Sequence, residues 1–137
     1  MNAPARRLLA INNYFYRRGG AEAVFFDHME MFRRLDWDVV PFAMQHGRNE
    51  PSPWSAYFVS EIEFGEPASL ARRVGQAASV IYSFEARRRL KALIERTQPA
   101  VAHAHNVYHH LSLAIFATLR AAGVPTVLTL HDLKIAC

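Results

Sequence analysis

The chain has 137 residues, of which 51% are hydrophobic and 20% are charged. This composition predicts one globular domain with a sizeable core and excludes a disordered chain. No apolar run approaches the ~20 residues that a membrane span requires, and the short run after Arg6–Arg7 excludes a secretory signal. The single cysteine, Cys137, excludes an internal disulfide and fits a reducing cytoplasm. A net charge of +4 favours an anionic partner, whether nucleotide, phospholipid surface or nucleic acid.

Hydrophobic periodicity and turn residues divide the chain into alternating strands and helices. Residues 1–6 are expected to form a disordered leader and residues 7–137 one domain. The expected strands are 7–13, 38–44, 57–59, 100–105 and 124–130. The expected helices are 21–35, 67–81, 83–97 and 111–122, with Ser83 as an N-cap and Gly123 at the C-cap position.

The stretch from Asn12 to Glu22 joins the first expected strand to the first expected helix, and it contains the pair Gly19–Gly20. The first amides of a helix lack internal partners and carry partial positive charge. Glycines permit φ > 0 and let a ligand approach the backbone closely. We therefore expect a phosphate or carboxylate against these amides. A plain turn between strand and helix explains the glycines equally well, and the loop alone does not separate the two interpretations.

Alternation of strands and helices predicts parallel units with helices on both faces of one sheet. We expect an α/β, doubly wound, Rossmann-like sheet with the order 3-2-1-4-5, counting the expected strands along the chain. Ligands bind such sheets outside the carboxyl ends of the strands, where the order reverses. Three polar strand ends should converge there: Asn12–Asn13 with Gly19–Gly20, then His103–Asn106, then His131–Asp132.

The expected helix over 21–35 has an apolar stripe at helical spacing. The predicted stripe contains Ala21, Val24, Phe25, His28, Met29, Phe32 and Leu35. The predicted solvent face contains Glu22, Asp27, Glu30, Arg33 and Arg34. His28 lies at the edge of the stripe, and the pattern gives it no function.

The histidines raise the question of a metal site. His103 and His105 are two residues apart and so face the same side of a strand; His109–His110 and His131 are further candidate ligands. The sequence has no C-x-x-C or H-E-x-x-H pattern, so we expect no metal. Within the pair, the deeper His103 is expected to be a core residue, whereas His105 and Asn106 are expected to face a ligand.

Other ligand classes lack their signatures. The dinucleotide pattern G-x-G-x-x-G and the Walker loop are absent, and no nucleic-acid-binding motif is visible, so we expect no nucleic acid partner. Two expected helices carry basic residues, Arg72–Arg73 and Arg87–Lys91, which are interpreted first as solvent-exposed helix faces. Contact with an anionic membrane surface is the alternative.

Three segments resemble motifs of glycosyltransferase family four, whose members are retaining enzymes of the two-domain GT-B type. Ile11–Glu22 is similar to the family's "GGAE" loop, and Gln98–Asn106 is similar to its "P-D-V-V-H-x-H-N" strand. Gly123–Asp132 is similar to its "G-x-P-V-V-x-T-x-H-D" strand. Together, in this order and spacing, they cover most of residues 7–137. Ala100 departs from the pattern, because an acidic residue is usual there.

The resemblance implies transfer of a sugar from a nucleotide-diphosphate donor to a sugar or lipid-linked acceptor, with retention, in polysaccharide or glycolipid synthesis. It implies no cofactor and no essential metal. His131 would lie beside the transferring sugar as the catalytic residue, and Gly19–Gly20 would bind the donor diphosphate or an acceptor phosphate. The implied acceptor-binding residues are Asn13, Arg17, Arg18, Glu22, His105, Asn106, His109 and Asp132.

The resemblance also implies a second, C-terminal domain that binds the nucleotide. Because the sequence stops just past the third motif, we expect a truncated first half of a GT-B fold that is inactive alone. A fragment, a truncated reading frame and a subunit of a split enzyme are left open. The alternative function is a non-catalytic module that binds an anion or a partner in the same crevice. We expect a cytoplasmic location, with peripheral attachment to the inner membrane face as an alternative.

Overall fold

The computed structural model describes residues 5–61, 84–108 and 111–132. The described elements alternate strand and helix, as the sequence pattern predicts. In chain order they are β1 (Arg7–Ile11), α1 (Gly20–Arg34), β2 (Asp38–Phe42), the 3-10 turn η1 (Ser55–Tyr57), the helical residues 84–97, β3 (Val101–Ala104), α3 (Ala114–Ala121) and β4 (Thr126–Leu128).

The strands form one parallel sheet in the order β2-β1-β3-β4. β1 pairs with β2 from Arg7–Asp38 to Ile11–Phe42, and with β3 from Leu8–Val101 to Ile11–Ala104. The expected third strand is reduced to one parallel bridge between Met44 and Val59, just past the end of β2. The α/β, doubly wound, Rossmann-like arrangement and its strand order are therefore confirmed.

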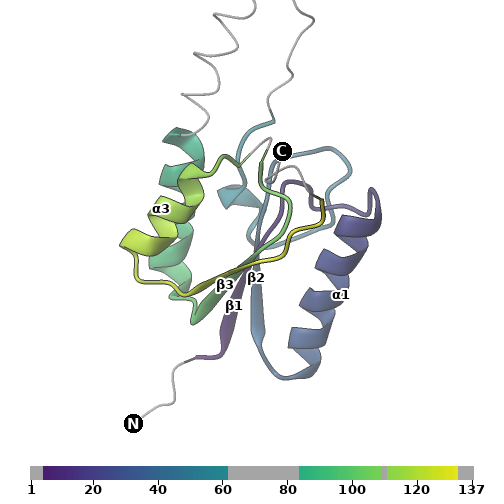
Figure 1. Cartoon of the computed structure of the whole chain (residues 1–137), viewed down its shortest axis with the longest axis horizontal. Helices are drawn as coiled ribbons and strands as arrows, with labels where there is room; N and C mark the ends of the chain where they lie inside the picture. The colour runs from purple at the N-terminus through teal and green to yellow at the C-terminus, as the bar shows by residue number, and fades with distance from the viewer. Residues whose placement is uncertain (1–4, 62–83, 109–110, 133–137) are drawn as a thin grey trace, which may run out of the picture.

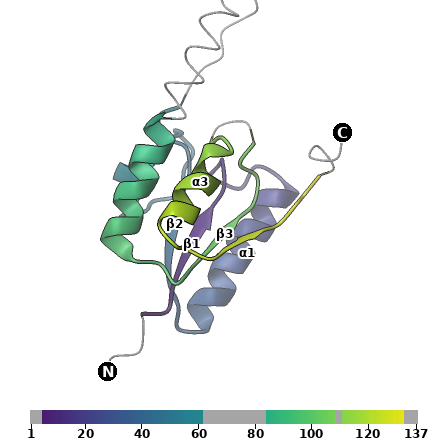
Figure 2. The ribbon, with the colours of Figure 1, turned by 60° about the vertical axis from the view of Figure 1, so that its left-hand side comes forward.

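Two helical layers cover the sheet. α1 lies on one face, while the helical residues 84–97 and α3 lie on the other (Figures 1 and 2). Alternate residues of β1 supply the two cores: Leu9 and Ile11 pack with the two-helix layer, and Leu8 and Ala10 pack with α1. A strand buried on both faces explains why β1 reads as a continuous apolar run.

Helix α1 begins and ends within one residue of the expected bounds, but its buried face is rotated. Phe25, Met29 and also Glu22 are buried, so the prediction that Glu22 faces solvent was wrong. Val24 and Leu35 are exposed instead of buried. α1 packs mainly over β1 and β2, and its His28 also reaches His103 of β3.

The end of α3 confirms the expected role of Gly123. Its φ of +68° is left-handed, the conformation that glycine adopts most easily. The Gly123 amide donates to the Arg120 carbonyl, and the Val124 amide donates to the Leu119 carbonyl. These two bonds form a Schellman motif, which ends the helix and turns the chain into β4.

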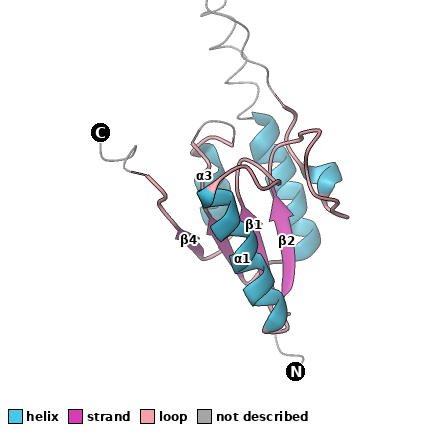
Figure 3. Cartoon of the chain, turned by 90° about the vertical axis from the view of Figure 1, so that its right-hand side faces the viewer, coloured by secondary structure: helices cyan, strands magenta, loops and turns pink. Residues whose placement is uncertain are grey.

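The last strand is shorter than expected. β4 covers Thr126–Leu128, pairs with β3, and lies at the sheet edge opposite β2 (Figure 3). Val127 is 54% exposed and Leu130 is 53% exposed, so the predicted apolar strand over 124–130 is not buried along its length.

Several expectations fall outside the described residues. These are the helix over 67–81 with Arg72 and Arg73, the N-cap at Ser83, most of the leader, the pair His109–His110, and Cys137. In addition, no helix among the described residues is long and apolar enough to cross a bilayer.

Glu85 connects the first turn of the helical residues 84–97 to the loop after the Met44–Val59 bridge. Its Oε1 accepts hydrogen bonds from the Ser60 amide at 3.2 Å, the Ser60 hydroxyl at 2.8 Å and Arg89 Nε at 2.7 Å. Burial alone would raise the pKa of Glu85, but these bonds outweigh it and hold that pKa below its ordinary value of 4.5. The carboxylate therefore stabilises the fold in its charged form.

We expect Glu85→Gln to lower the free energy of unfolding at pH 7 by about 1 kcal/mol, since a partly exposed charged acceptor is lost. The stabilisation is complete above about pH 4.5 and is lost as the pH falls through the lowered pKa of the folded state. Urea unfolding at pH 7 and at pH 3 measures both effects. Glu95→Gln, which removes an exposed carboxylate 3.8 Å from Lys91 Nζ, is the control. An equal deficit for Glu85→Gln at both pH values contradicts this account.

Candidate functional site

Buried asparagines join the carboxyl ends of β1 and β3. Asn12 Oδ1 accepts from the Asn106 amide at 3.1 Å, and the Asn13 amide donates to the Asn106 carbonyl at 2.7 Å. Asn13 Oδ1 also accepts from the Leu111 amide at 3.2 Å. Each bond within the fold contributes about 1 kcal/mol, and an unpaired buried partner would cost more. These contacts fix the loops that follow the two strands relative to each other.

A polar cavity of about 480 Å³ opens beside these strand ends. It lies at the N-terminus of α1, where the sheet order reverses, which is the position expected for a ligand in this fold. The cavity brings together seven residues that the sequence singles out: Asn13, Arg18, Gly19, Gly20, Glu22, Asn106 and Asp132. Three strand ends thus contribute to one site.

The cavity carries charges of both signs. Glu22 and Asp132 supply carboxylates, and Arg18 supplies a guanidinium held 4.5 Å above the ring of Tyr14. The first amides of α1 add partial positive charge on the same side as Arg18. Such a lining suits a ligand that has both hydroxyl groups, which donate to carboxylates, and an anionic group.

The glycine pair provides open space at the cavity wall and does not adopt a left-handed backbone conformation. Gly19 has φ of −166°, an extended conformation, so the expectation that φ > 0 explains the pair does not hold. A Cβ built on Gly20 would meet nothing within 4 Å, and one on Gly19 would lie 3.6 Å from Glu22 Oε2. Bare backbone at the cavity wall therefore leaves room for a ligand close to the amides of α1.

Two aromatic residues of the cavity were missed from the sequence: Tyr14 and Tyr108. The Tyr108 hydroxyl is buried and has no hydrogen-bond partner within the described residues. Burial, and then the negative charge of Asp132, raise the pKa of Tyr108, so the hydroxyl keeps its proton at neutral pH. A buried unpaired hydroxyl is costly, and a polar ligand in this cavity would satisfy it. No spacing rule in the sequence marks this residue.

Among the described residues, three of those named from the resemblance are not in the cavity wall: Arg17, His105 and His131. Arg17 turns toward α1, where its Nη2 lies 3.8 Å from Asp27 and its guanidinium lies 5.2 Å from the ring centre of Phe26. His105 and His131 lie under or beside the wall and contact each other. His109 is outside the described residues.

The order of burial of the strand histidines is the reverse of the expected one. His105 is 1% exposed, whereas His103 is only half-buried. His105 packs against Phe25 of α1 at 5.4 Å between ring centres and stacks on His131 at 5.2 Å. His103 lies one pleat earlier, where its Nε2 is 2.7 Å from the hydroxyl of Thr129. Direct contact between His105 and a ligand in the cavity is therefore not supported.

Both strand histidines are neutral at physiological pH. Burial is the main cause, followed by repulsion from the neighbouring histidines, and together they lower the pKa of His105 to about 3. The pKa of His103 is lowered by burial and then by His28 and His131. His105 Nδ1 lies 2.9 Å from His131 Nε2, so one of these rings donates to the other. This contact fixes the orientation of the His131 ring next to Asp132.

A larger hollow of about 840 Å³ lies elsewhere, between the helical residues 84–97 and α3. Arg87, Arg88 and Lys91 line it together with apolar residues of both helices. It contains none of the strand ends, so it is separate from the polar cavity. In this fold the switch point is the favoured ligand site, and we assign the candidate site to the smaller cavity.

Comparison with curated proteins gives no match. A family profile described as Glycosyltransferase Family 4 matches residues 18–135, which begin at Arg18 in the cavity wall and include all of α1 to β4. This match covers most of the chain and agrees with the parallel sheet, the glycine-lined helix N-terminus and the strand ends described above. The chain therefore belongs to Glycosyltransferase Family 4.

Proposed function

We propose that this domain forms the acceptor-side lobe of an enzyme that transfers a sugar from a nucleotide-sugar donor to an acceptor with retention of configuration. The observation that carries the proposal is the polar cavity at the switch point, where the α1 amides, two carboxylates and one guanidinium converge. An acceptor of a polysaccharide or glycolipid pathway offers hydroxyl groups for Glu22 and Asp132. A phosphate of donor or acceptor suits Arg18 and the amides of Gly19 and Gly20.

His131 is the proposed catalytic residue. Its Nε2 contacts His105, so its Nδ1 is the nitrogen left to bond a sugar hydroxyl or to stabilise positive charge on the transferring ring. The buried, neutral His105 would act as a positioning residue for His131. Asn13 lines the cavity, but its Oδ1 is engaged by the Leu111 amide, so we assign it mainly to positioning the wall.

Transfer is proposed to require a second, nucleotide-binding lobe that closes over the first. The described cavity is open, and enclosure by both lobes would exclude water from the reacting sugar. The alternative function is a non-catalytic module that binds an anion or a partner in the same cavity. Nucleoside diphosphates and sugar phosphates as ligands favour the transferase, whereas binding of inorganic phosphate alone, with no gain from a sugar, favours the module.

One prediction tests whether the backbone at Gly20 binds an anion. Gly20→Ala places a methyl group at the cavity where nothing lies within 4 Å, so the fold should tolerate it. We expect affinity for nucleoside diphosphates, measured by calorimetric titration, to fall about tenfold, or ~1.4 kcal/mol, because the backbone is less accessible. Gly47→Ala is the matched control, since a Cβ there also meets nothing within 4 Å and the residue is outside the cavity. Equal affinity in both variants contradicts the proposed anion site.

Another prediction distinguishes a ligand-binding role of the Tyr108 hydroxyl from a structural one. Tyr108→Phe removes a hydroxyl that has no partner within the described residues, so its melting temperature should be unchanged or higher. Affinity for a sugar phosphate should fall about fivefold to tenfold, or ~1 kcal/mol, since one hydrogen bond to the ligand is lost. Thermal unfolding and titration with glucose 1-phosphate measure the two effects. A destabilised variant with unchanged affinity would show that the hydroxyl is structural.

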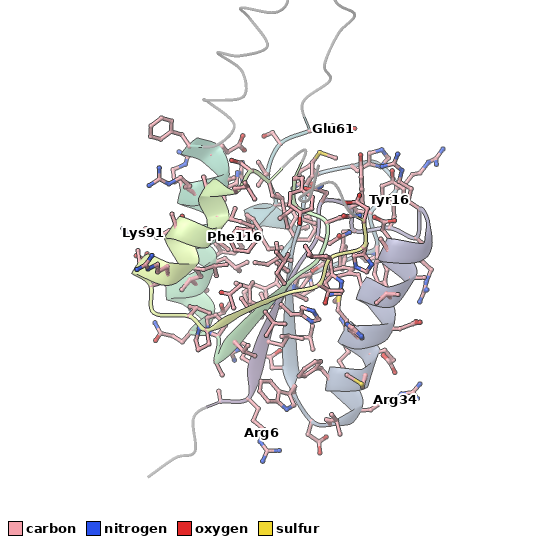
Figure 4. All side chains as sticks on the ribbon, viewed as in Figure 1. Arg6, Tyr16, Arg34, Glu61, Lys91 and Phe116 are labelled. Atoms are coloured by element: carbon pink, nitrogen blue, oxygen red, sulfur yellow. The ribbon has the colours of Figure 1, made fainter. Side chains whose placement is uncertain are left out.

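A peripheral position at an anionic membrane surface is a further proposal, supported by one patch. Phe84 is 67% exposed beside Arg87, Arg88 and Lys91 at the start of the helical residues 84–97. Figure 4 shows Lys91 on the outer side of this layer, across the molecule from Arg34 on α1. Arg89 does not belong to the patch, because it bonds Glu85 and the Ala56 carbonyl. Basic side chains around an exposed aromatic ring suit anionic headgroups.

Removing two charges from the patch should weaken vesicle binding. We expect Arg87→Gln with Arg88→Gln to reduce sedimentation with phosphatidylglycerol vesicles by about 30-fold, at roughly 1 kcal/mol per charge. The control is Arg33→Gln with Arg34→Gln, which removes the same charge from α1 on the opposite side of the sheet. Equal losses in the two pairs would mean non-specific attraction, and no sedimentation of the unmodified chain would remove the proposal.

A further inference from the structure

We propose that His28, His103 and His105 form a binding site for one transition-metal cation of the zinc class. One ring nitrogen from each of the three side chains lies within 4.8 Å of the other two. His28 comes from α1, and the other two come from β3 and the residue that follows it, so the site joins a helix to the sheet. This inference does not rest on the proposed sugar transfer.

The three rings form a compact triangle. The ring centres of His103 and His105 are 4.2 Å apart, those of His28 and His103 are 5.3 Å apart, and those of His28 and His105 are 5.5 Å apart. Nitrogens that share a tetrahedral zinc ion lie about 3.4 Å from each other, given Zn–N bonds of about 2.1 Å. Modest rotation of the half-buried His28 and His103 side chains would close the triangle onto an ion.

The outer ring nitrogens are already engaged, as metal ligands require. His103 Nε2 lies 2.7 Å from the Thr129 hydroxyl, and His105 Nδ1 lies 2.9 Å from His131 Nε2. A histidine that binds a metal through one nitrogen typically donates its other N–H to such a partner, which fixes the ring and its tautomer. Nδ1 of His103 and Nε2 of His105 then remain for the ion.

The third ligand supplies an independent observation. His28 Nδ1 is buried and has no hydrogen-bond partner within the described residues. Buried ring nitrogens normally find a partner, and the His28 ring lies beside two other imidazoles, with ring centres 5.3 Å away at His103 and 5.5 Å away at His105. A cation at the centre would satisfy all three nitrogens at once.

The ligand type restricts the ion. Imidazole nitrogen suits Zn²⁺, Co²⁺, Ni²⁺ and Cu²⁺, whereas Mg²⁺ and Ca²⁺ require oxygen ligands. The group found among the described residues contains three histidines and neither carboxylate nor thiolate. Three imidazole ligands leave a fourth position for water or another group. The sequence pattern missed this site because His28 lies 75 residues before His103 and is brought to it only by packing of α1 on the sheet.

Cobalt titration of the full chain tests the proposal. After removal of metal with a chelator, we expect Co²⁺ to bind one equivalent with the intense visible absorption of a tetrahedral site, and Zn²⁺ to displace it. His28→Gln should abolish this spectrum, because a primary ligand is lost. His46→Gln should leave it unchanged, since His46 stacks on Tyr16 and is outside the triangle. The double variant His109→Gln, His110→Gln should also retain it.

A second measurement needs no ligand variant. Long-range ¹H–¹⁵N spectra of the seven histidine rings should show Zn²⁺ shifting one nitrogen in each of His28, His103 and His105. Thr129→Val should lower Co²⁺ affinity about 10- to 100-fold while the spectrum at saturation is kept, since only the support of one ligand is removed. Absence of Co²⁺ binding by the unmodified chain, an unchanged spectrum in His28→Gln, or shifts confined to other histidines would each overturn the proposal.

Discussion

The hydrogen bonds between the carboxyl ends of β1 and β3 are the constraint on which the candidate site depends. Asn12 and Asn13 are buried, and their amide groups bond the backbone of Asn106 and Leu111. The backbone adds two further contacts between these segments: the His105 amide donates to the Ile11 carbonyl, and the Asn13 amide donates to the Asn106 carbonyl. The polar side chains of Asn12 and Asn13 therefore stabilise the fold, and the cavity lies beside the loops that they hold together.

The chemistry of the cavity follows from the start of α1. A helix N-terminus attracts anions, yet Glu22 already places a buried carboxylate in its first turn. A second anion at the same amides would be repelled unless Arg18 lies between the two charges. In the proposed site, an anionic group would therefore be accepted near Arg18, and hydroxyl groups would be accepted near Glu22 and Asp132. Sugars that carry a phosphate meet both conditions.

Sequence reasoning predicted what depends on local pattern. Local sequence determines three of these features: the apolar run of β1, the glycine pair before α1 and Gly123 after α3. The strand order was predicted from the alternation of strands and helices. Sequence reasoning was wrong where tertiary packing determines whether a side chain is buried. Glu22 is buried where it lines the cavity, and His105 is buried because Phe25 and His131 pack against it. Phe25 and His131 are distant from His105 in sequence, so no periodicity could indicate its burial.

One feature of α1 links the two sites of this domain. Gly20 lies at the cavity and His28 lies at the histidine triangle, on the same uninterrupted 15-residue helix. Eight residues of α-helix span about 12 Å and behave as a stiff rod. A ligand that draws the beginning of the helix inward would also slide or tilt His28 against β3, and an ion bound to His28 would hold the middle of the helix in place. A ligand bound at either site would then restrict movement of α1 at the other site.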